Sequence, residues 1–261
     1  MPDADKTTES IIPGNTHVKA KIQTREEMIF AGKEIIPHCF GEKCKITINI
    51  EDGDLLAVGD ILGIVVGPAR EILSRERVML NLIQRLCGIA TLTHKYVNLA
   101  KPFNVKILDT RKTTPGLRLF EKYAVSIGGA YNHRLNLSDG ILIKDNHIIL
   151  AGSVKDAVKV AQKNETDLSI ELEVENTNQI KEALNIGVDS FLLDNMTRNA
   201  VLHAISLIRN FENGEDIFIE ASGGINFDNI HSYLDTGVNA ISIGALTHRA
   251  ISKDIHLEFI K

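Results

Sequence analysis

Residues 168–195 read LSIELEVENTNQIKEALNIGVDSFLLDN, and this stretch decides the fold class. Two short apolar segments, LSIEL and SFLL, flank a polar loop and a helical segment. Gly187 stands just ahead of the second apolar segment, where a left-handed helix cap is expected. A strand, a helix and a second strand in this order form one β/α unit, which implies a parallel sheet.

The same rhythm extends in both directions from this unit, beginning at Val105. Six short apolar segments are each followed by polar residues and a helical stretch: VKIL, ILIK, LSIEL, SFLL, IFIE and AISIG. Gly237 stands before the last of them, in the same position as Gly187 before its strand. Regular spacing and chain length favour a barrel of the TIM type over a doubly wound sheet, although six units fall short of eight.

The residues before this repeat have a different pattern. Between about residues 17 and 70, glycine turns separate strand-like segments that read HVKAKIQT, KITINI and ILGIVVG. After Pro68 a helical stretch continues to about Ala100, and its apolar side is expected to carry Val78, Leu82, Ile83, Leu86, Ile89 and Ala90. We therefore expect a small α+β sandwich domain with a connecting helix over residues 1–100, and a catalytic α/β barrel over 101–250. A tail over 251–261 is expected to pack back on the first domain.

Composition bounds the class of protein. The 261 residues are 44% hydrophobic and 24% charged, as in a folded globular protein, and their net charge of −5 argues against nucleic acid as a partner. No apolar run reaches the ~18 residues of a membrane span, and the amino terminus lacks a secretory pattern, so we expect no membrane association and a cytoplasmic location. Cys39, Cys44 and Cys87 form no CxxC pair, which indicates reduced thiols, with Cys87 in a helix core.

Basic side chains follow the expected strands, at the end where a β/α barrel carries its active site. These positions hold Arg111, Lys112, His133, Arg134 and Lys144. Arginine forks bind carboxylates or phosphates and lysine supplies a point charge, so the mixture indicates a substrate with several anionic groups. Each cation alone is better explained as part of a solvated surface, but their repeated placement after apolar strands favours a ligand.

Two glycine-containing turns follow the last two strands. Residues 222–224 read Ser-Gly-Gly and open into a helix, so that backbone N–H groups can approach a phosphate. Ser242 and Gly244 repeat this arrangement one unit later. Adjacent late loops of this kind form the phosphate site of many TIM barrels.

Acidic side chains end two neighbouring strands on the same face. Glu173 and Asp194 in these positions most simply hold Mg²⁺ or the hydroxyls of a sugar, or else cap helices and pair with lysines. Glu171 and Glu175 are weaker candidates. The residues thus indicate binding or transfer of a phosphorylated sugar together with an acidic small molecule, while a Schiff base on Lys144 remains the alternative.

Nine motifs in a fixed order carry a family resemblance. They are ERVMLN at 76–81, CGIAT at 87–91, DTRKTTPG at 109–116, HR at 133–134, ILIKDNHI at 141–148, IELEVEN at 170–176, LLDNM at 192–196, EASGGI at 220–225 and SIGALTH at 242–248. On these motifs the chain resembles the quinolinate phosphoribosyltransferase family, also called nicotinate-nucleotide pyrophosphorylase (carboxylating). The resemblance implies an incomplete α/β barrel after a small amino-terminal domain, and a homodimer, sometimes within a hexamer, in which the partner covers each site.

The resemblance also implies a reaction. Quinolinate and phosphoribosyl pyrophosphate give nicotinate mononucleotide, pyrophosphate and carbon dioxide, with Mg²⁺ required, in de novo NAD synthesis. By carry-over, the quinolinate carboxylates bind Arg111, His133, Arg134 and Lys144, with Arg77 reaching in from the neighbouring subunit. The pyrophosphoryl group faces Lys112 and Lys144, the ribose hydroxyls and the metal are held by Glu173 and Asp194, and the phosphate is cradled by Ser222, Gly223, Gly224, Ser242 and Gly244. Lys144, Glu173 and Asp194 are the expected catalytic residues.

This chemistry agrees with the residue types. Loss of pyrophosphate from ribose passes through an oxocarbenium-like state, which carboxylates stabilise while cations stabilise the leaving group. The pyridine nitrogen then attacks, and the positively charged ring becomes an electron sink for loss of the adjacent carboxylate. No protein nucleophile is needed, which accounts for the absence of an activated serine or cysteine from the motifs.

Other functions remain open at this point. A molybdenum-associated relative of the same fold shares much of the pattern, an aldolase would use Lys144 as a Schiff-base lysine, and a silent ligand-binding regulator would keep the fold alone. Family members also usually carry another helix before a segment that corresponds here to PDADKTTES, with Lys6 at a usually apolar position. That helix supports the dimer interface, so the departure bears on oligomer stability more than on chemistry.

Overall fold

The computed structural model describes residues 5–164 and 167–260, and the chain divides into two compact units. The first unit contains the residues up to His94, Tyr123–Gly129 and the segment from Arg249 onward. The second contains Lys95–Lys122 and Ala130–His248. The expected boundary at residue 100 differs from this division because helix α3 (Ala69–Ala100) runs unbroken from one unit into the other.

An antiparallel sheet in the order β12-β1-β5-β3 forms the framework of the first unit. Its strands are β1 (His17–Thr24), β3 (Lys45–Ile48), β5 (Ile61–Pro68) and β12 (Ile255–Ile260). Alternate residues of β1, namely Ala20, Ile22 and Thr24, are buried, as expected for a strand with one covered face. The residues expected to form a returning tail therefore contribute strand β12, which pairs directly with β1.

Helix α3 buries one side along the part that belongs to the first unit. Met79, Ile83, Leu86 and Cys87 are fully buried there, and burial raises the pKa of the Cys87 thiol to about 12. The prediction was wrong for Val78, which is 61% exposed, because a period of 3.6 residues places Met79 and Ile83 on the covered side instead. The other elements of this unit are α1 (Lys6–Ile11), β2 (Met28–Ile29), α2 (Ile36–Cys39) and β4 (Leu55–Leu56).

A six-stranded parallel sheet in the order β6-β11-β10-β9-β8-β7 forms the framework of the second unit. The strands are β6 (Lys106–Leu108), β7 (Ile141–Ile143), β8 (Ile170–Val174), β9 (Ser190–Asp194), β10 (Phe218–Ser222) and β11 (Ala240–Ser242). All six predicted strands are confirmed. Because β6 and β7 are the two edges of this sheet, it has the form of an incomplete TIM-like barrel.

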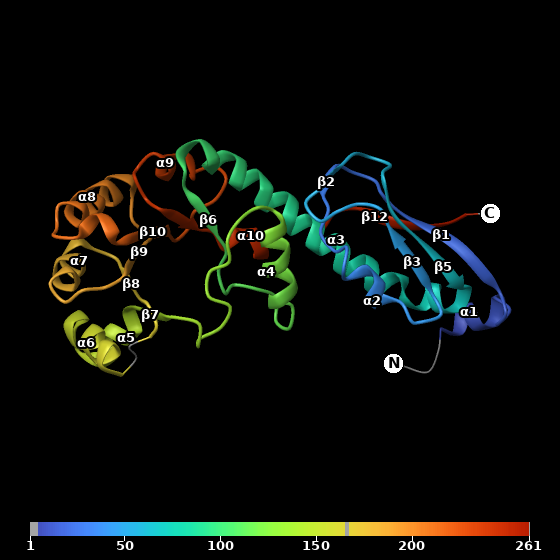
Figure 1. The fold of residues 1–261 in the computed structure, drawn as a ribbon, viewed down its shortest axis with the longest axis horizontal. Coiled ribbons are helices and arrows are strands. Elements are labelled where there is room, and N and C mark those ends of the chain that lie inside the picture. The colour runs from blue at the N-terminus through green and yellow to red at the C-terminus, as the bar shows by residue number, and fades with distance from the viewer. Residues whose placement is uncertain (1–4, 165–166, 261) are drawn as a thin grey trace. The chain divides into compact units, whose positions relative to one another are not determined.

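Helices connect the parallel strands of this sheet. They are η1 (Lys101–Phe103), α4 (Arg118–Ile127), α5 (Asp145–Ala151), α6 (Val154–Asn164), α7 (Thr177–Leu184), α8 (Arg198–Arg209), η2 (Gly214–Asp216), α9 (His231–Leu234) and α10 (Ala245–His248). Figure 1 shows α6, α7 and α8 next to one another along the outside of the strands. Gly187 and Gly237 precede β9 and β11 with φ of 91° and 96°, which confirms the predicted left-handed positions.

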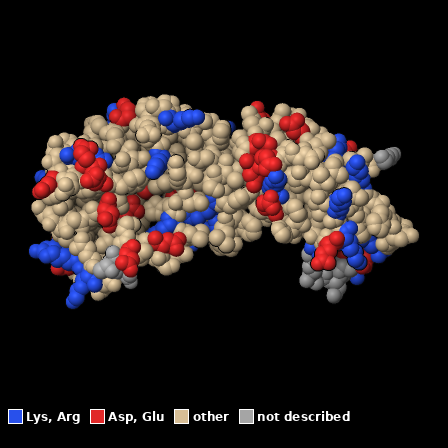
Figure 2. All heavy atoms as spheres, in the orientation of Figure 1, with Lys and Arg blue, Asp and Glu red and all other residues tan. Residues whose placement is uncertain are grey.

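The surface carries both acidic and basic side chains. On the face drawn in Figure 2, acidic and basic side chains are scattered among neutral ones. Within residues 5–164 and 167–260, none of the helices has the combination of length and hydrophobicity that a bilayer span needs.

Candidate active site

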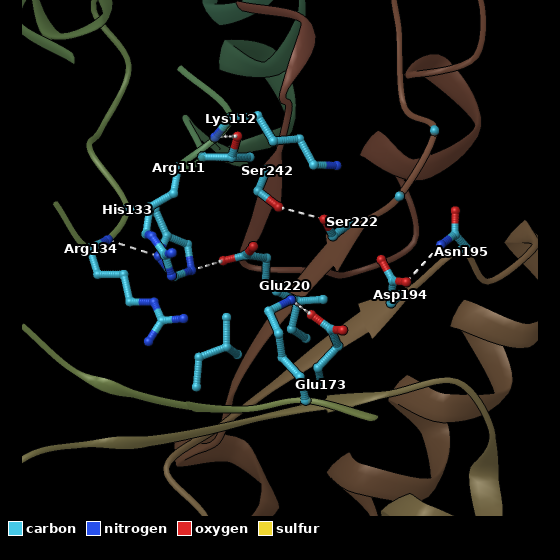
Figure 3. A pocket seen from close by; sticks show the side chains of 16 residues that line it. Arg111, Lys112, His133, Arg134, Glu173, Asp194, Asn195, Glu220, Ser222 and Ser242 are labelled. Carbon is cyan, nitrogen blue, oxygen red and sulfur yellow. Dashed lines mark hydrogen bonds and ion pairs between the residues drawn. The ribbon is translucent and has the colours of Figure 1, made fainter. Parts of the chain in front are cut away.

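A cavity of about 460 Å³ lies in the second unit, at the carboxyl ends of its strands (Figure 3). Its lining consists of Thr110, Arg111, Lys112, His133, Arg134, Leu142, Lys144, Glu173, Leu192, Asp194, Asn195, Glu220, Ser222, Gly223, Gly224 and Ser242. The parallel register explains why these residues meet: Glu173, Leu192 and Glu220 lie opposite one another on β8, β9 and β10. Asp194 and Ser222 form the next row toward the strand ends.

Two of the predicted site residues lie outside this lining. Gly244 is close to it, since a Cβ added there would lie 3.2 Å from Cδ of Lys112 and 3.2 Å from Nε2 of His248. Arg77 is exposed on α3, in the first unit. Its role at a partner's site therefore stays a prediction.

Four side chains, which we call the rim cations, bring positive charge to the cavity: Arg111, Lys112, Arg134 and Lys144. Burial, and then the charge of Arg111, lower the pKa of the Arg134 guanidinium, whose Nη1 donates to the Gly140 carbonyl at 3.1 Å. Among the described residues, Nε of Arg111 is buried without a hydrogen-bond partner. Four basic side chains around one cavity, one of which has a nitrogen without a hydrogen-bond partner, are suited to an anionic ligand.

The two predicted acids have different partners. Nζ of Lys144 forms an ion pair with Glu173, and the side chain of this lysine is 41% exposed. Asp194 accepts a hydrogen bond from Nδ2 of Asn195 at 2.6 Å. A Schiff-base lysine needs an apolar, desolvated surrounding, so the geometry of Lys144 does not support the aldolase alternative.

The Ser-Gly-Gly turn approaches the loop after β9 very closely. Gly223 has φ of 90°, and a Cβ added to it would lie 2.4 Å from Oδ1 and 2.6 Å from the backbone nitrogen of Asn195. That nitrogen donates to the Ser222 carbonyl at 2.9 Å, and Ser242 Oγ donates to Ser222 Oγ at 2.8 Å. Only glycine fits this position, and it leaves the backbone bare toward the cavity.

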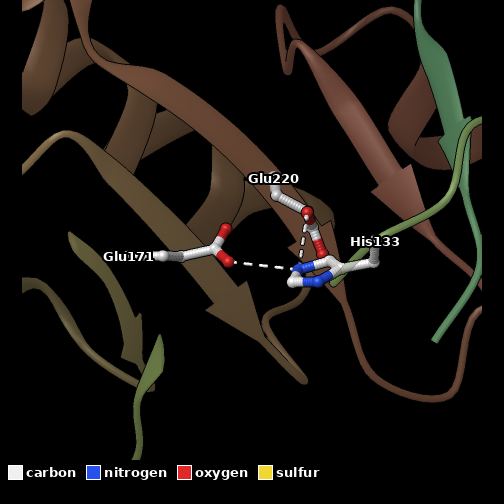
Figure 4. Close-up of side chains that lie close together, drawn as sticks. All are labelled: His133, Glu171 and Glu220. Carbon is white, nitrogen blue, oxygen red and sulfur yellow. Dashed lines mark hydrogen bonds and ion pairs between the residues drawn. The ribbon is translucent and has the colours of Figure 1, made fainter. Parts of the chain in front are cut away.

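Three titratable side chains, which we call the floor cluster, have atoms within 4.8 Å of one another: His133, Glu171 and Glu220 (Figure 4). Glu220 is buried and the other two are half-buried. Nε2 of His133 lies 3.1 Å from Oε2 of Glu171 and 3.7 Å from Oε2 of Glu220. The backbone N–H of Arg134 donates to Nδ1 of His133 at 2.8 Å. Because Nδ1 is an acceptor, Nε2 carries the proton and donates toward the two carboxyl groups.

Glu220 is the most deeply buried member of the floor cluster. It is 1% exposed, and within the described part of the chain its Oε1 has no hydrogen-bond partner. Burial first, and then the charge of Glu171, raise the pKa of Glu220 from 4.5 to about 8. These surroundings favour the neutral acid of Glu220 over its carboxylate.

The strand pattern contains a signal for the floor cluster. Glu171, one of the weaker candidates from the sequence, shares its strand face with Glu173. Glu220 is two residues before Ser222 and so points to the same side of β10. Glu220 lies within its strand, whereas the candidates that the sequence indicates follow their strands or end them.

A buried ion pair holds the backbone of His133. Lys122 and Asp109 form this pair, with side chains 3% and 0% exposed. Oδ1 of Asp109 accepts the His133 N–H at 2.8 Å, and Nζ of Lys122 donates to the His133 carbonyl at 2.8 Å. Both backbone groups of His133 are thus fixed by the same pair.

Comparisons with known proteins give this geometry a family. Residues 5–87 and 89–258 match the quinolinate phosphoribosyl transferase N-terminal and C-terminal domains. A probable nicotinate-nucleotide pyrophosphorylase [carboxylating] from Bacillus subtilis is 44% identical, over 97% of this chain and 87% of its own length. The nicotinate-nucleotide pyrophosphorylase [carboxylating] from Mycobacterium leprae is 38% identical, over 97% of this chain and 90% of its own length.

A solved structure agrees with these relatives. The crystal structure of nicotinate-nucleotide pyrophosphorylase from Ehrlichia chaffeensis superimposes with a TM-score of 0.92, at 39% identity, over 98% of this chain and 92% of its own. Both domains, the fold and nearly the whole length therefore agree. The chain belongs to the quinolinate phosphoribosyltransferase family.

Proposed function

We propose that this protein transfers the phosphoribosyl group of phosphoribosyl pyrophosphate to quinolinate and releases carbon dioxide, to form nicotinate mononucleotide for NAD synthesis. The observation that carries the proposal is the convergence in one cavity of the rim cations, two carboxylates and the glycine turn. These three sets match the three parts of the reaction: a dicarboxylate acceptor, a ribose that becomes cationic, and phosphate groups. The names of the relatives describe the same conversion.

The rim cations bind and orient the acceptor. Arg111 and Arg134 line the cavity, and their planar forks fit the carboxylates of quinolinate. Lys112 follows β6 with an exposed side chain that extends into the cavity above Ser242 (Figure 3). We assign Lys112 to the pyrophosphate, whose negative charge grows as the bond to ribose breaks.

The acids and the glycine turn act on the donor. Glu173 and Asp194 lie on neighbouring strands, where they can bind ribose hydroxyls and stabilise the oxocarbenium-like state. The ion pair of Lys144 with Glu173 holds both side chains at this position before substrate arrives. The bare backbone of residues 223 and 224, with Ser222 and Ser242, would receive the phosphate of the donor.

We also propose Mg²⁺ as the cofactor, bound by Glu173 and Asp194. Mg²⁺ usually binds one or two carboxylates together with substrate phosphates and water, and these two side chains supply that oxygen set. Bound there, it would neutralise charge on the pyrophosphate. The floor cluster fits a metal less well, since Nε2 of His133 carries a proton and burial favours the neutral form of Glu220.

The first experiment is an assay of pyrophosphate and nicotinate mononucleotide with quinolinate, phosphoribosyl pyrophosphate and Mg²⁺. We expect both products, and we expect none when a chelator removes Mg²⁺ or when nicotinate replaces quinolinate. Activity with nicotinate but not quinolinate would contradict the proposed acceptor. Full activity in chelator would contradict the proposed cofactor only.

We further propose a homodimer in which Arg77 reaches the partner's cavity, and a cytoplasmic location. Mixing two variants tests the dimer: Arg77→Ala and Lys144→Ala are each expected to be inactive alone. A hybrid dimer would contain one cavity with its own Lys144 and the other subunit's Arg77, so mixing should restore activity. A fully active monomer, or no recovery in proven hybrids, would contradict the assignment. Cell fractionation tests the location.

A further inference from the structure

The proposed reaction consumes one proton. None of the roles assigned above to the residues of the cavity provides a donor for it. When carbon dioxide leaves the ribosylated quinolinate, the electron pair of the broken bond stays on ring carbon 2, beside the cationic ring nitrogen. That carbon must take up one proton to give nicotinate mononucleotide. The donor has to be an acid that is protonated at working pH and reaches the part of the cavity where the carboxylates bind.

Most cationic groups at the cavity are unsuitable as this donor. Arg111 and Arg134 keep their protons at any working pH. Lys144 is engaged in its ion pair with Glu173. The Nε2 proton of His133 is directed toward Glu171, and Nδ1 is occupied by the Arg134 N–H.

Glu220 meets the requirements. It lines the cavity, is 1% exposed and is flanked in the sheet by two apolar residues, Leu192 on β9 and Ala240 on β11. Figure 3 shows its carboxyl group in the midst of His133, Ser242, Ser222 and Glu173. Its Oε1 is buried and, among residues 5–164 and 167–260, has no hydrogen-bond partner, so this oxygen is unsatisfied beside the cavity that the residue lines.

Burial is the main reason why Glu220 favours its acid form, and the charges of Glu171 and Glu173 on β8 add to it. His133, from the segment before β7, and the hydrogen bond with Ser242 on β11 act in the opposite direction and lower the pKa, but burial outweighs them. Two negative neighbours and the loss of solvent oppose a further negative charge. The carboxyl group thus holds a transferable proton while its own solvent exposure is only 1%.

We propose that Glu220 is a catalytic residue, the general acid that protonates ring carbon 2 as carbon dioxide leaves; this inference rests on the proposed function. In this step the bond between ring carbon 2 and the carboxylate carbon breaks, and carbon dioxide departs. The electron pair left on ring carbon 2 forms a new C–H bond with the proton of Glu220, whose O–H bond breaks. The resulting carboxylate regains a proton from solvent after the product leaves.

Single-turnover measurements of both products test this assignment. With quinolinate labelled in the 2-carboxylate, Glu220→Gln should form pyrophosphate within about threefold of the unmodified rate, while release of labelled carbon dioxide falls about hundredfold. Ribosylated quinolinate that retains both carboxylates should accumulate. Glu220→Asp keeps an acid at this position and should release carbon dioxide faster than Glu220→Gln.

A pH profile and a control variant sharpen the test. Only the protonated form donates, so carbon dioxide release by the unmodified enzyme should fall as pH rises through about 8. The exposed Glu175, just after β8 and outside the cavity lining, gives the matched control Glu175→Gln, which should change neither step.

The outcomes are distinct. Undiminished carbon dioxide release in Glu220→Gln would overturn the inference. An equal fall in pyrophosphate and carbon dioxide formation would also overturn it, because Glu220 would then shape the cavity rather than donate a proton. If the unmodified protein forms no pyrophosphate from quinolinate, the proposed function itself fails, and the inference fails with it.

Discussion

The rim cations and two members of the floor cluster, His133 and Glu220, line the same cavity, but their electrostatic surroundings differ. At the rim, Lys144 pairs with Glu173 and its side chain is 41% exposed, so charge is paired and partly solvated. At the floor, the side chains of His133, Glu171 and Glu220 are 17%, 14% and 1% exposed, and burial disfavours the charged form of Glu220. The surroundings of a glutamate, and not its residue type alone, therefore set its role. Glu173 is suited to stabilise a cation, and Glu220 is suited to donate a proton.

The buried ion pair of Lys122 and Asp109, which holds the backbone of His133, should give the largest effect on stability. Asp109→Leu leaves the Lys122 ammonium without its partner and releases the backbone of His133. We expect the free energy of unfolding to fall by about 3–5 kcal/mol, measured by urea denaturation. The double variant Asp109→Leu/Lys122→Met removes both charges and should recover most of the loss. If the double variant is as unstable as the single one, the charge of Lys122 is not the cause.

Removing a rim cation should give the largest effect on catalysis. Lys144→Met deletes the partner of Glu173 and one of the positive charges at the cavity. We expect kcat to fall about 10²–10³-fold, as for other groups that stabilise developing charge, with little change in unfolding. Steady-state kinetics measures this effect. An unchanged kcat with only a raised KM would show that Lys144 binds substrate without acting on the transition state.

The floor cluster should reveal itself in the pH dependence of stability. The pKa of Glu220 is raised from 4.5 to about 8 in the folded protein. The contribution of this group to the free energy of unfolding is therefore complete below pH 4.5 and is lost as pH rises toward 8. Because glutamine does not titrate, Glu220→Gln abolishes this pH-dependent decrease. Relative to the unmodified protein it should therefore gain on the order of 2 kcal/mol between pH 5 and 7, followed by calorimetry. A difference that stays constant from pH 5 to 8 would contradict a neutral Glu220.

The smallest effect is expected at the most exposed rim position. Lys112 is exposed, and water and salt therefore screen its charge. Lys112→Met should raise KM for phosphoribosyl pyrophosphate by about tenfold at low salt and by less at high salt. A larger effect that does not depend on salt would place Lys112 with the buried groups rather than with the solvated ones.

Much of the fold and of the rim could be predicted from sequence because both follow local rules. The strand segments and the caps at Gly187 and Gly237 depend on patterns of a few residues, and cations placed after parallel strands must meet at one edge. The floor cluster depends on non-local contacts. His133 meets Glu171 and Glu220 only when three separate segments are folded, and Asp109 reaches Lys122 in the same way. Val78 shows a further limit, since a shift of one residue moves a helical side chain from the covered side to the open one.

The pairing of β12 with β1 has a consequence for the order in which the protein is made. On the ribosome β1 emerges early, but its partner Ile255–Ile260 follows all the residues of the second unit. One edge of β1 must therefore wait through most of translation with its backbone groups unpaired, a state in which exposed strands are prone to associate with other chains. A stop codon that removed only these last residues would harm the unit that was synthesised first.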